Sequence, residues 1–223
     1  TNAGLDQIST YRKMMIYEKA DDRFMVMLSA GNLSISQSVR EILQVEKLDN
    51  GDAPPLTIWN ATSMFDATRV LGSAVRRVYE QDAASLKATG IDFNASMIFG
   101  GQIKGEAMRL FLVYSAGNFI EATRETCLFQ VGESKYGKPI LDRVIRPDTT
   151  IEEAVMAALV SMDSTVRSNL SVGMPLDLCV IPANEFKAKS QRIESDHKEF
   201  RQISDSWAAS LRTAFNALPD VKI

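Results

Sequence analysis

The sequence of 223 residues predicts an α+β fold in four layers, αββα, in which helices cover the outer faces of two antiparallel sheets. Three observations predict it. Strand-like segments come in neighbouring pairs separated by short polar turns. Two helix-like segments then follow each other directly, where a doubly wound fold would alternate helices with strands. Further strands and helices follow in the C-terminal part of the chain.

Residues 11–31 are expected to form the first hairpin, around which the rest of the chain is organised. The side chains alternate at its start, so that Lys13 and Met15 share one face of a strand and Met14 lies on the other. Two aspartates interrupt the alternation before the second strand begins. That strand ends in a serine, an alanine and Gly31, which are small enough for another backbone to approach closely. We therefore expect Lys13 and the bend at Gly31 to face a common cleft.

Two helices are expected next, over residues 33–49 and 63–89. Apolar residues recur at helical spacing in both segments, which predicts one buried face for each helix. Glycine and proline residues follow the first segment and a glycine follows the second, and these residues end helices.

A second group of strands is predicted after these helices. Residues 92–100 and 108–115 are typical of an antiparallel pair, and residues 127–131 of another short strand. Gly100 and Gly101 are expected to form a turn. A phosphate-binding loop is not expected there, because the sequence has neither a G-x-x-x-x-G-K-[ST] nor a G-x-G-x-x-G pattern.

The C-terminal part predicts helices around one returning strand. Residues 138–145 form a short predicted helix that stops before a proline, and Thr150 with Glu153 has the spacing of a capping box that starts the next helix. Residues 175–181 are expected to form the strand. Residues 196–218 then carry a continuous apolar stripe with charged residues between, which predicts an amphipathic helix.

Composition excludes several classes of function. A net charge of −3 without a Lys/Arg cluster argues against a nucleic-acid partner, and no apolar run is long enough to span a membrane. Cys127 and Cys179 are separated and set in apolar surroundings, as expected of free thiols in a reducing cytoplasm. We expect no metal or cofactor, because the single histidine, His197, has no cysteine or acidic residue at ligand spacing and fits a surface helix.

Several segments resemble the β-type subunits of the proteasome and its bacterial relatives, which are N-terminal nucleophile hydrolases. Arg12-Lys13 resembles the strand that carries the active-site lysine of that family, and Ala30-Gly31 resembles the bend whose backbone N–H serves the oxyanion. The bacterial Anbu group, the ancestral β subunit, is the most similar. The segments that carry this likeness are TNAG, ISTYRKM, LSAGNLS, GESKYGKPILDR and RSNLSVGMPLDL.

The resemblance covers nearly the whole chain. It implies the N-terminal nucleophile hydrolase fold for residues 1–187, with the first hairpin of that fold missing from the N-terminus. Residues 188–223 are expected to form a C-terminal helical extension. We expect its apolar stripe to contact another subunit, although packing against the chain's own core is the alternative.

The resemblance also implies a set of site residues. The catalytic residues are expected to be Lys13 and Gly31, with Ser171 and Asp163 bracing the nucleophile. The nucleophile is expected to be a threonine upstream of this sequence, because Thr1 falls about a strand pair too late; Thr1 as nucleophile is the alternative. The residues expected to contact substrate are Thr1, Asn2, Tyr11, Met15, Ser29 and Leu33. These suggest a pocket for an uncharged side chain.

Two positions depart from the family pattern. Glu133 stands where a serine is expected, unless Ser134 takes that place after a shift of one residue. Spacing puts Asn169 where the family has an aspartate and Ser171 or Val172 on its serine, whereas identity favours Asp163 as the aspartate. The serines in this region have an alternative interpretation as ordinary residues of a helix end.

The function implied is that of a threonine-type peptidase subunit, which cleaves peptides or unfolded proteins within a ring or a helical homo-oligomer in the cytoplasm. The alternative is a catalytically silent subunit that serves assembly, in which Lys13 has only a structural role. The departures at Glu133 and Asn169 would suit such a protein.

Overall fold

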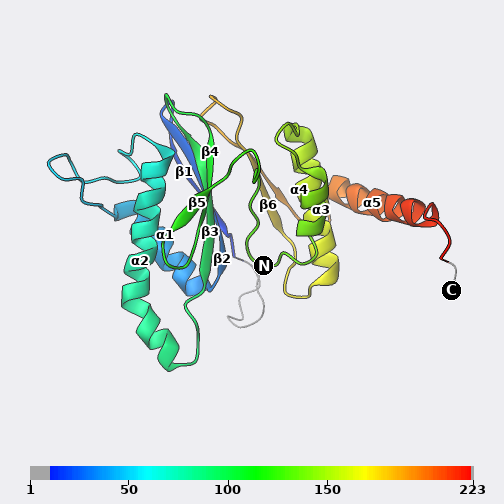
Figure 1. Ribbon diagram of the computed structural model, residues 1–223, viewed down its shortest axis with the longest axis horizontal. Coiled ribbons are helices and arrows are strands. Elements are labelled where there is room, and N and C mark those ends of the chain that lie inside the picture. Colours follow the sequence, from blue (N-terminus) through cyan, green and yellow to red (C-terminus); the bar gives the residue numbers. More distant parts are fainter. Residues whose placement is uncertain (1–10, 222–223) are drawn as a thin grey trace. The chain divides into compact units, whose positions relative to one another are not determined.

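The computed structural model describes residues 11–221 of the chain, which fold into seven strands and five helices (Figure 1). They divide into two compact units. The first, here called the sheet unit, comprises Tyr11–Gly132 and Cys179–Ser190. The second, the helical unit, comprises Glu133–Leu178 and the described residues from Gln191 onward. The predicted domain boundary at residue 187 stays a prediction.

The sheet unit contains a five-stranded antiparallel sheet in the order β1-β2-β3-β4-β5. The predicted first hairpin is confirmed as its first two strands, with Met14 opposite Leu28 and Lys19 opposite Arg23. Successive strands of the sheet are also successive in the sequence. The strands are β1 (Met14–Lys19), β2 (Arg23–Gly31), β3 (Ala95–Ile103), β4 (Arg109–Val113) and β5 (Phe119–Glu121).

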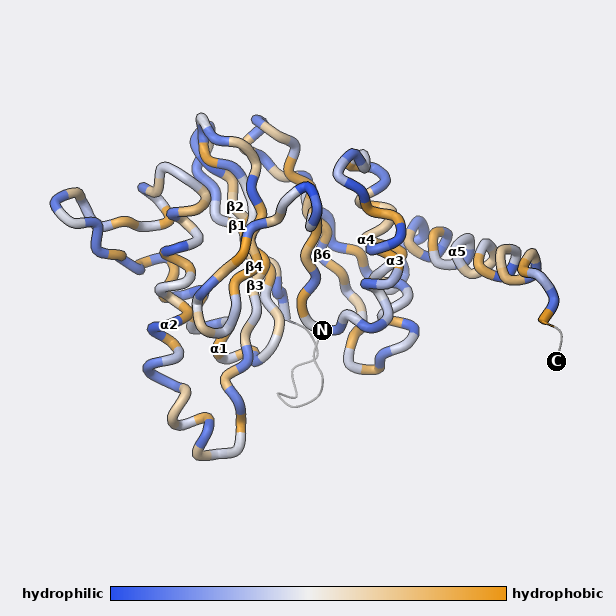
Figure 2. The backbone as a smooth tube through the Cα atoms, in the orientation of Figure 1, coloured by the Kyte–Doolittle hydropathy of each residue, from blue (hydrophilic) through white to orange (hydrophobic). Residues whose placement is uncertain are grey.

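Two helices, α1 (Leu33–Val45) and α2 (Met64–Ala88), share one hydrophobic core with this sheet (Figure 1). The strand period of two decides which residues enter it: Met25 and Met27 of β2 lie in the core shared with the helices. Phe24 and Val26 belong instead to a smaller core that residues 179–188 help to form. Because β2 buries both of its faces, it is a nearly continuous hydrophobic run in the sequence (Figure 2).

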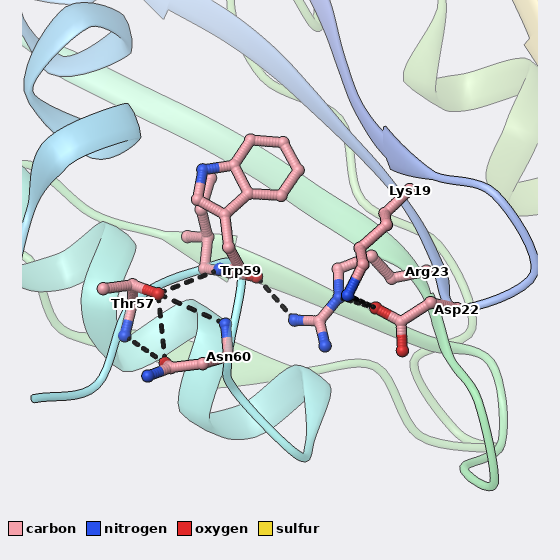
Figure 3. Close-up of polar contacts among 7 residues, drawn as sticks. Lys19, Asp22, Arg23, Thr57, Trp59 and Asn60 are labelled. Carbon is pink, nitrogen blue, oxygen red and sulfur yellow. Dashed lines mark hydrogen bonds and ion pairs between the residues drawn. The ribbon is translucent and has the colours of Figure 1, made fainter. Parts of the chain in front are cut away.

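The turn between β1 and β2 is anchored by a buried arginine (Figure 3). Arg23 is only 5% exposed, and it donates hydrogen bonds of 2.7 Å to the Asp22 carboxylate and to the carbonyl oxygen of Ile58. Thr57 and Asn60 bond each other in the same loop, which precedes α2. The end of the hairpin remote from Gly31 is thereby held to this loop.

The turn predicted at Gly100 and Gly101 is wrong, because both residues lie inside β3. A Cβ atom on Gly101 would fall 2.0 Å from the carbonyl oxygen of Phe24 and 2.8 Å from the Cα atom of Met25. Glycine is present there because the backbones of β2 and β3 approach closely, with Gly101 at a φ of 151°. The turn falls a few residues later, around Gly105.

Three further expectations need correction. Residues 127–131 form no strand, because this half-buried apolar run has no partner strand for a hydrogen-bonded ladder. The first helix ends at Val45, four residues early, and an isolated β-bridge between Leu48 and Leu56 follows it. Two short strands with few apolar residues, β5 and β7 (Lys189–Ile193), were not predicted from the sequence.

The predicted helices of the helical unit are confirmed as α3 (Lys138–Val144), α4 (Ile151–Ser168) and α5 (Lys198–Asn216), and the predicted strand as β6 (Leu176–Val180). The predicted capping box is present: Thr150 Oγ1 accepts from the backbone N–H of Glu153 at 3.2 Å, and Glu153 accepts from that of Thr150 at 3.0 Å. Strands β6 and β7 form a second, two-stranded sheet, so the described residues have a mixed α/β fold with two antiparallel sheets.

Candidate active-site residues

Lys13 lies immediately before β1, at the end of the hairpin where β2 stops. Its carbonyl oxygen accepts a hydrogen bond of 3.1 Å from the backbone N–H of Ser29, which continues the register of the β1–β2 ladder by one pair. The structure therefore brings together Lys13 and Ser29, two of the predicted site residues. Within residues 11–221 the half-buried Lys13 side chain forms no ion pair.

Gly31 ends β2 in a conformation that favours glycine. Its φ is 101°, and a Cβ atom there would lie 2.3 Å from the carbonyl oxygen of Asn94. The next residue, Asn32, accepts from the backbone N–H of Ser34 at 2.9 Å and so caps α1. Gly31 is exposed and lies one residue before a helix N-terminus, whose partial positive charge favours an anion nearby.

A second glycine approaches the same bend. Gly132 has a φ of 80°, and a Cβ atom built on it would lie 3.3 Å from the Cβ of Ala30. The next residue is Glu133, one of the two positions expected to depart from the family pattern. Ala30, Gly31 and Gly132 together leave room around the exposed backbone at the end of β2.

Three residues of the predicted substrate pocket lie in or contact α1. Leu33 is the first residue of the helix and is buried, whereas Tyr11 and Met15 are half-buried. Arg40, which the sequence analysis missed, contacts two of them: its Nη1 atom donates to Tyr11 Oη at 3.2 Å and lies 3.9 Å from Met15 Sδ. The sequence did contain a signal for Arg40: it follows Leu33 by two helical turns, so Arg40 and Leu33 lie on one side of α1.

Tyr17 lies on the same face of the first hairpin strand as Met15 and is buried. Burial raises the pKa of its phenol well above the usual range, although the positive charge of Arg40 acts in the opposite direction. In the described part of the chain its hydroxyl has no hydrogen-bond partner. Tyr17 is therefore a neutral phenol whose one polar atom is unsatisfied near a guanidinium.

In the helical unit, the Asp163 carboxylate is buried and already occupied. Its Oδ1 atom accepts from Ser204 Oγ of α5 at 2.6 Å and from Arg167 Nε at 3.3 Å. Asp163 therefore holds α5 against α4. Its predicted role in bracing a nucleophile stays a prediction.

The other predicted brace residues form a different network. Asn169 Oδ1 accepts from both the backbone N–H of Ser171, at 2.8 Å, and its hydroxyl, at 2.7 Å. The Asn169 side-chain nitrogen donates to Glu133 Oε2 at 2.7 Å, and the other oxygen of Glu133 accepts from the backbone N–H of Lys135 at 2.8 Å. The structure thus joins Glu133, Asn169 and Ser171, the alternative that spacing favoured.

Two predicted site residues, Thr1 and Asn2, lie outside the described residues. Across residues 11–221 there is no group of three or more histidine, cysteine or acidic side chains placed to hold a metal ion. No helix in that range has the length and apolar character needed to cross a membrane.

Comparison with known proteins finds no matching family model and no matching curated protein. Solved structures are similar over the whole chain. Anbu (ancestral beta-subunit) from Yersinia bercovieri is 46% identical with a TM-score of 0.88, covering 100% of this chain and 92% of that one. The helical assembly of the Anbu complex from Pseudomonas aeruginosa is 42% identical with a TM-score of 0.88, covering 100% of this chain and 90% of that one. An Anbu (Gly-1) mutant from Hyphomicrobium sp. strain MC1 is 44% identical with a TM-score of 0.87, covering 100% of this chain and 91% of that one.

Proposed function

Because the chain belongs to the Anbu group of proteasome-like ancestral β subunits, we propose that it is a threonine-type peptidase subunit that cleaves peptide bonds within a homo-oligomer. The observation that carries this proposal is the pairing of Lys13 with the Ser29 backbone beside the exposed bend at Gly31. A cation and an exposed backbone donor at one end of a hairpin are two of the groups that assist a nucleophile in attacking an amide carbonyl.

In the proposed reaction a threonine hydroxyl attacks the peptide carbonyl, and the α-amine of the same threonine carries the proton. The positive charge of Lys13 lowers the pKa of that amine and keeps it neutral, so that it can accept the proton. The tetrahedral oxyanion is held by the N–H of Gly31, a contribution of about 3 kcal/mol. The sequence prediction that this threonine precedes Thr1, with Thr1 as the alternative, stays a prediction.

Substrate recognition is proposed to be mainly through the main chain. An extended peptide adds as a strand beside Gly31 and Asn2, and its side chain lies near Tyr11, Met15 and Leu33. Ser171 and Asn169 are proposed to brace the nucleophile, with Glu133 fixing Asn169.

The proposal extends to assembly and place of action. The Anbu complex of Pseudomonas aeruginosa forms a helical assembly, which supports a homo-oligomer for this chain. We place it in the cytoplasm, where the free thiols Cys127 and Cys179 would stay reduced. The four-layer αββα arrangement predicted from the sequence belongs to the same proposal.

A silent assembly subunit remains the second candidate, favoured by one observation. If the spacing prediction holds, Asn169 presents an amide where the family has a carboxylate, and Glu133 presents a carboxylate where the family has a serine. The two side chains bond each other, and in a silent subunit this hydrogen bond would stabilise the fold without a part in catalysis.

Lys13→Ala separates the two candidates. The peptidase proposal expects peptide hydrolysis to fall by at least about 10²-fold, because the amine is then protonated at neutral pH, while the oligomer mass is unchanged. Lys19→Ala is the matched control: Lys19 lies on the same hairpin, its side chain is 63% exposed, and it pairs with Asp22 at 3.5 Å. Absence of hydrolysis in every form, with assembly intact, would support the silent subunit.

A further inference from the structure

Arg40 is a guanidinium whose contacts fall on two of the predicted substrate residues. Its side chain is 29% exposed, so solvent reaches it. It comes from α1, whereas Tyr11 and Met15 come from the segment that leads into and forms β1. A helix and a strand therefore bring a fixed positive charge to the place where we propose that the substrate side chain lies.

The hydrogen bonds of Arg40 leave capacity for an anion. Nε and Nη2 donate to a single oxygen of Glu41, at 2.9 and 2.6 Å, and Nη1 faces Tyr11 Oη and Met15 Sδ. A thioether is a weak acceptor, and of the five guanidinium N–H groups one has no acceptor among the described residues. One N–H on Nη1 and one on Nη2 are thus available to a carboxylate, which an arginine binds with two parallel hydrogen bonds.

The surrounding charges also favour an anion. Lys13 lies on the same face of the strand as Met15, two residues earlier. The hydroxyl of the buried Tyr17 has no partner among residues 11–221 and is close enough for Arg40 to influence it. Within residues 11–221 the acidic group bonded to Arg40 is Glu41, which is 62% exposed and therefore well solvated. Residues adjacent on a helix do not face each other, so the Arg40–Glu41 pair contributes little to helix stability.

We propose that Arg40 makes this subunit selective for acidic side chains, so that peptide bonds are cut after glutamate or aspartate. This inference rests on the proposed peptidase function and revises the expectation of an uncharged side chain. A substrate carboxylate would replace Met15 Sδ at Nη1 and share the guanidinium with Glu41.

The test compares the hydrolysis of three peptides that differ only in glutamate, leucine or arginine before the cleaved bond. We expect kcat/KM for the glutamate peptide to exceed the others by at least tenfold, with the difference mainly in KM. Arg40→Gln should abolish this preference and Arg40→Lys should keep part of it. Arg69→Gln is the control, because Arg69 pairs with Asp66 on the exposed side of α2.

A second variant acts in the opposite direction. Glu41→Gln removes the charge that competes for the guanidinium, so the preference for glutamate should rise. A purely structural role of Arg40 would leave the preference unchanged in Glu41→Gln. Cleavage of the three peptides at equal rates, or an undiminished glutamate preference in Arg40→Gln, would overturn the inference.

A binding measurement separates this inference from the proposed function. Calorimetric titration of acetylated peptides that end in glutamate or leucine requires no turnover. If no peptide is cleaved, the peptidase proposal fails; tighter binding of the glutamate peptide that is lost in Arg40→Gln would still support the acidic preference. Equal binding of both peptides would overturn the acidic preference even if cleavage were observed.

Discussion

Glu133 and Asn169, the two positions that the sequence predicts to depart from the family pattern, have side chains joined by a hydrogen bond of 2.7 Å. The sequence shows two irregular positions 36 residues apart, and nothing in their spacing indicates that they touch. The same limit applies to Asp163, which identity favoured for the site but whose carboxylate is bound to Ser204. Residue types were readable from the sequence, whereas the partners of these side chains depend on tertiary packing.

Asn169→Asp tests this pair. It replaces the donor with a second carboxylate opposite Glu133, and we expect the free energy of unfolding to fall by about 2 kcal/mol, the cost of a lost charge-assisted bond. The double variant Glu133→Gln with Asn169→Asp exchanges donor and acceptor and should recover most of the loss. Urea unfolding of the two single variants and the double variant measures the coupling; additive losses would show that the two side chains act independently.

At the level of elements, the sequence predicted the first hairpin, the helices α2 and α5, and the capping box at the start of α4. Each of these has a clear hydrophobic period or a clear end signal. The sequence-based prediction failed where glycine is present for a reason other than a turn. The Gly100–Gly101 pair was interpreted as a turn but allows two backbones to approach inside the sheet. It failed also for β5, which has only three residues, and for β7, whose sequence KSQRI has one apolar residue.

Gly101→Ala should therefore disrupt the sheet. The new methyl group would meet the Phe24 carbonyl within the β2–β3 ladder. Because the atoms it meets belong to the backbone, they cannot move aside as the end of a flexible side chain could. We therefore expect the free energy of unfolding to fall by about 3 kcal/mol or more. Gly105→Ala is the matched control: its φ of 87° is strained for alanine, but no atom lies within 4 Å of the added Cβ. The free energy of unfolding of that variant should fall by about 1–2 kcal/mol. Equal unfolding midpoints for the two variants would contradict the role assigned to close approach.

At the scale of the whole molecule, motifs spread along the chain predicted the family, and the structural similarity over its full length confirms it. The contacts of Arg40 were not predicted, because they join residues 25 and 29 positions apart. The apolar stripe of α5 was predicted, and the structure divides it. Phe200 is buried in the helical unit, whereas Leu211, Phe215 and Leu218 are exposed by 50%, 72% and 63%.

This division gives a sharper assembly test than removal of the whole helix, which would also remove Ser204 from Asp163. Leu211→Ser combined with Phe215→Ser changes only the exposed part of the stripe. We expect it to reduce the mass of the assembly measured by light scattering, since exposed apolar side chains of this size suit a subunit contact. Leu170→Ser, at a fully exposed leucine outside α5, is the control. An unchanged mass in the double variant would exclude the stripe from the contact.

The central claim is that this subunit cleaves peptide bonds with the help of Lys13. The most direct measurement is mass-spectrometric detection of new termini in a mixture of defined peptides, after incubation with the assembled protein expressed from its complete reading frame. We predict cleavage by the wild type and by Lys19→Ala, and its loss in an equally assembled Lys13→Ala. Cleavage that persists in Lys13→Ala, or its absence from the assembled wild type, would contradict the claim.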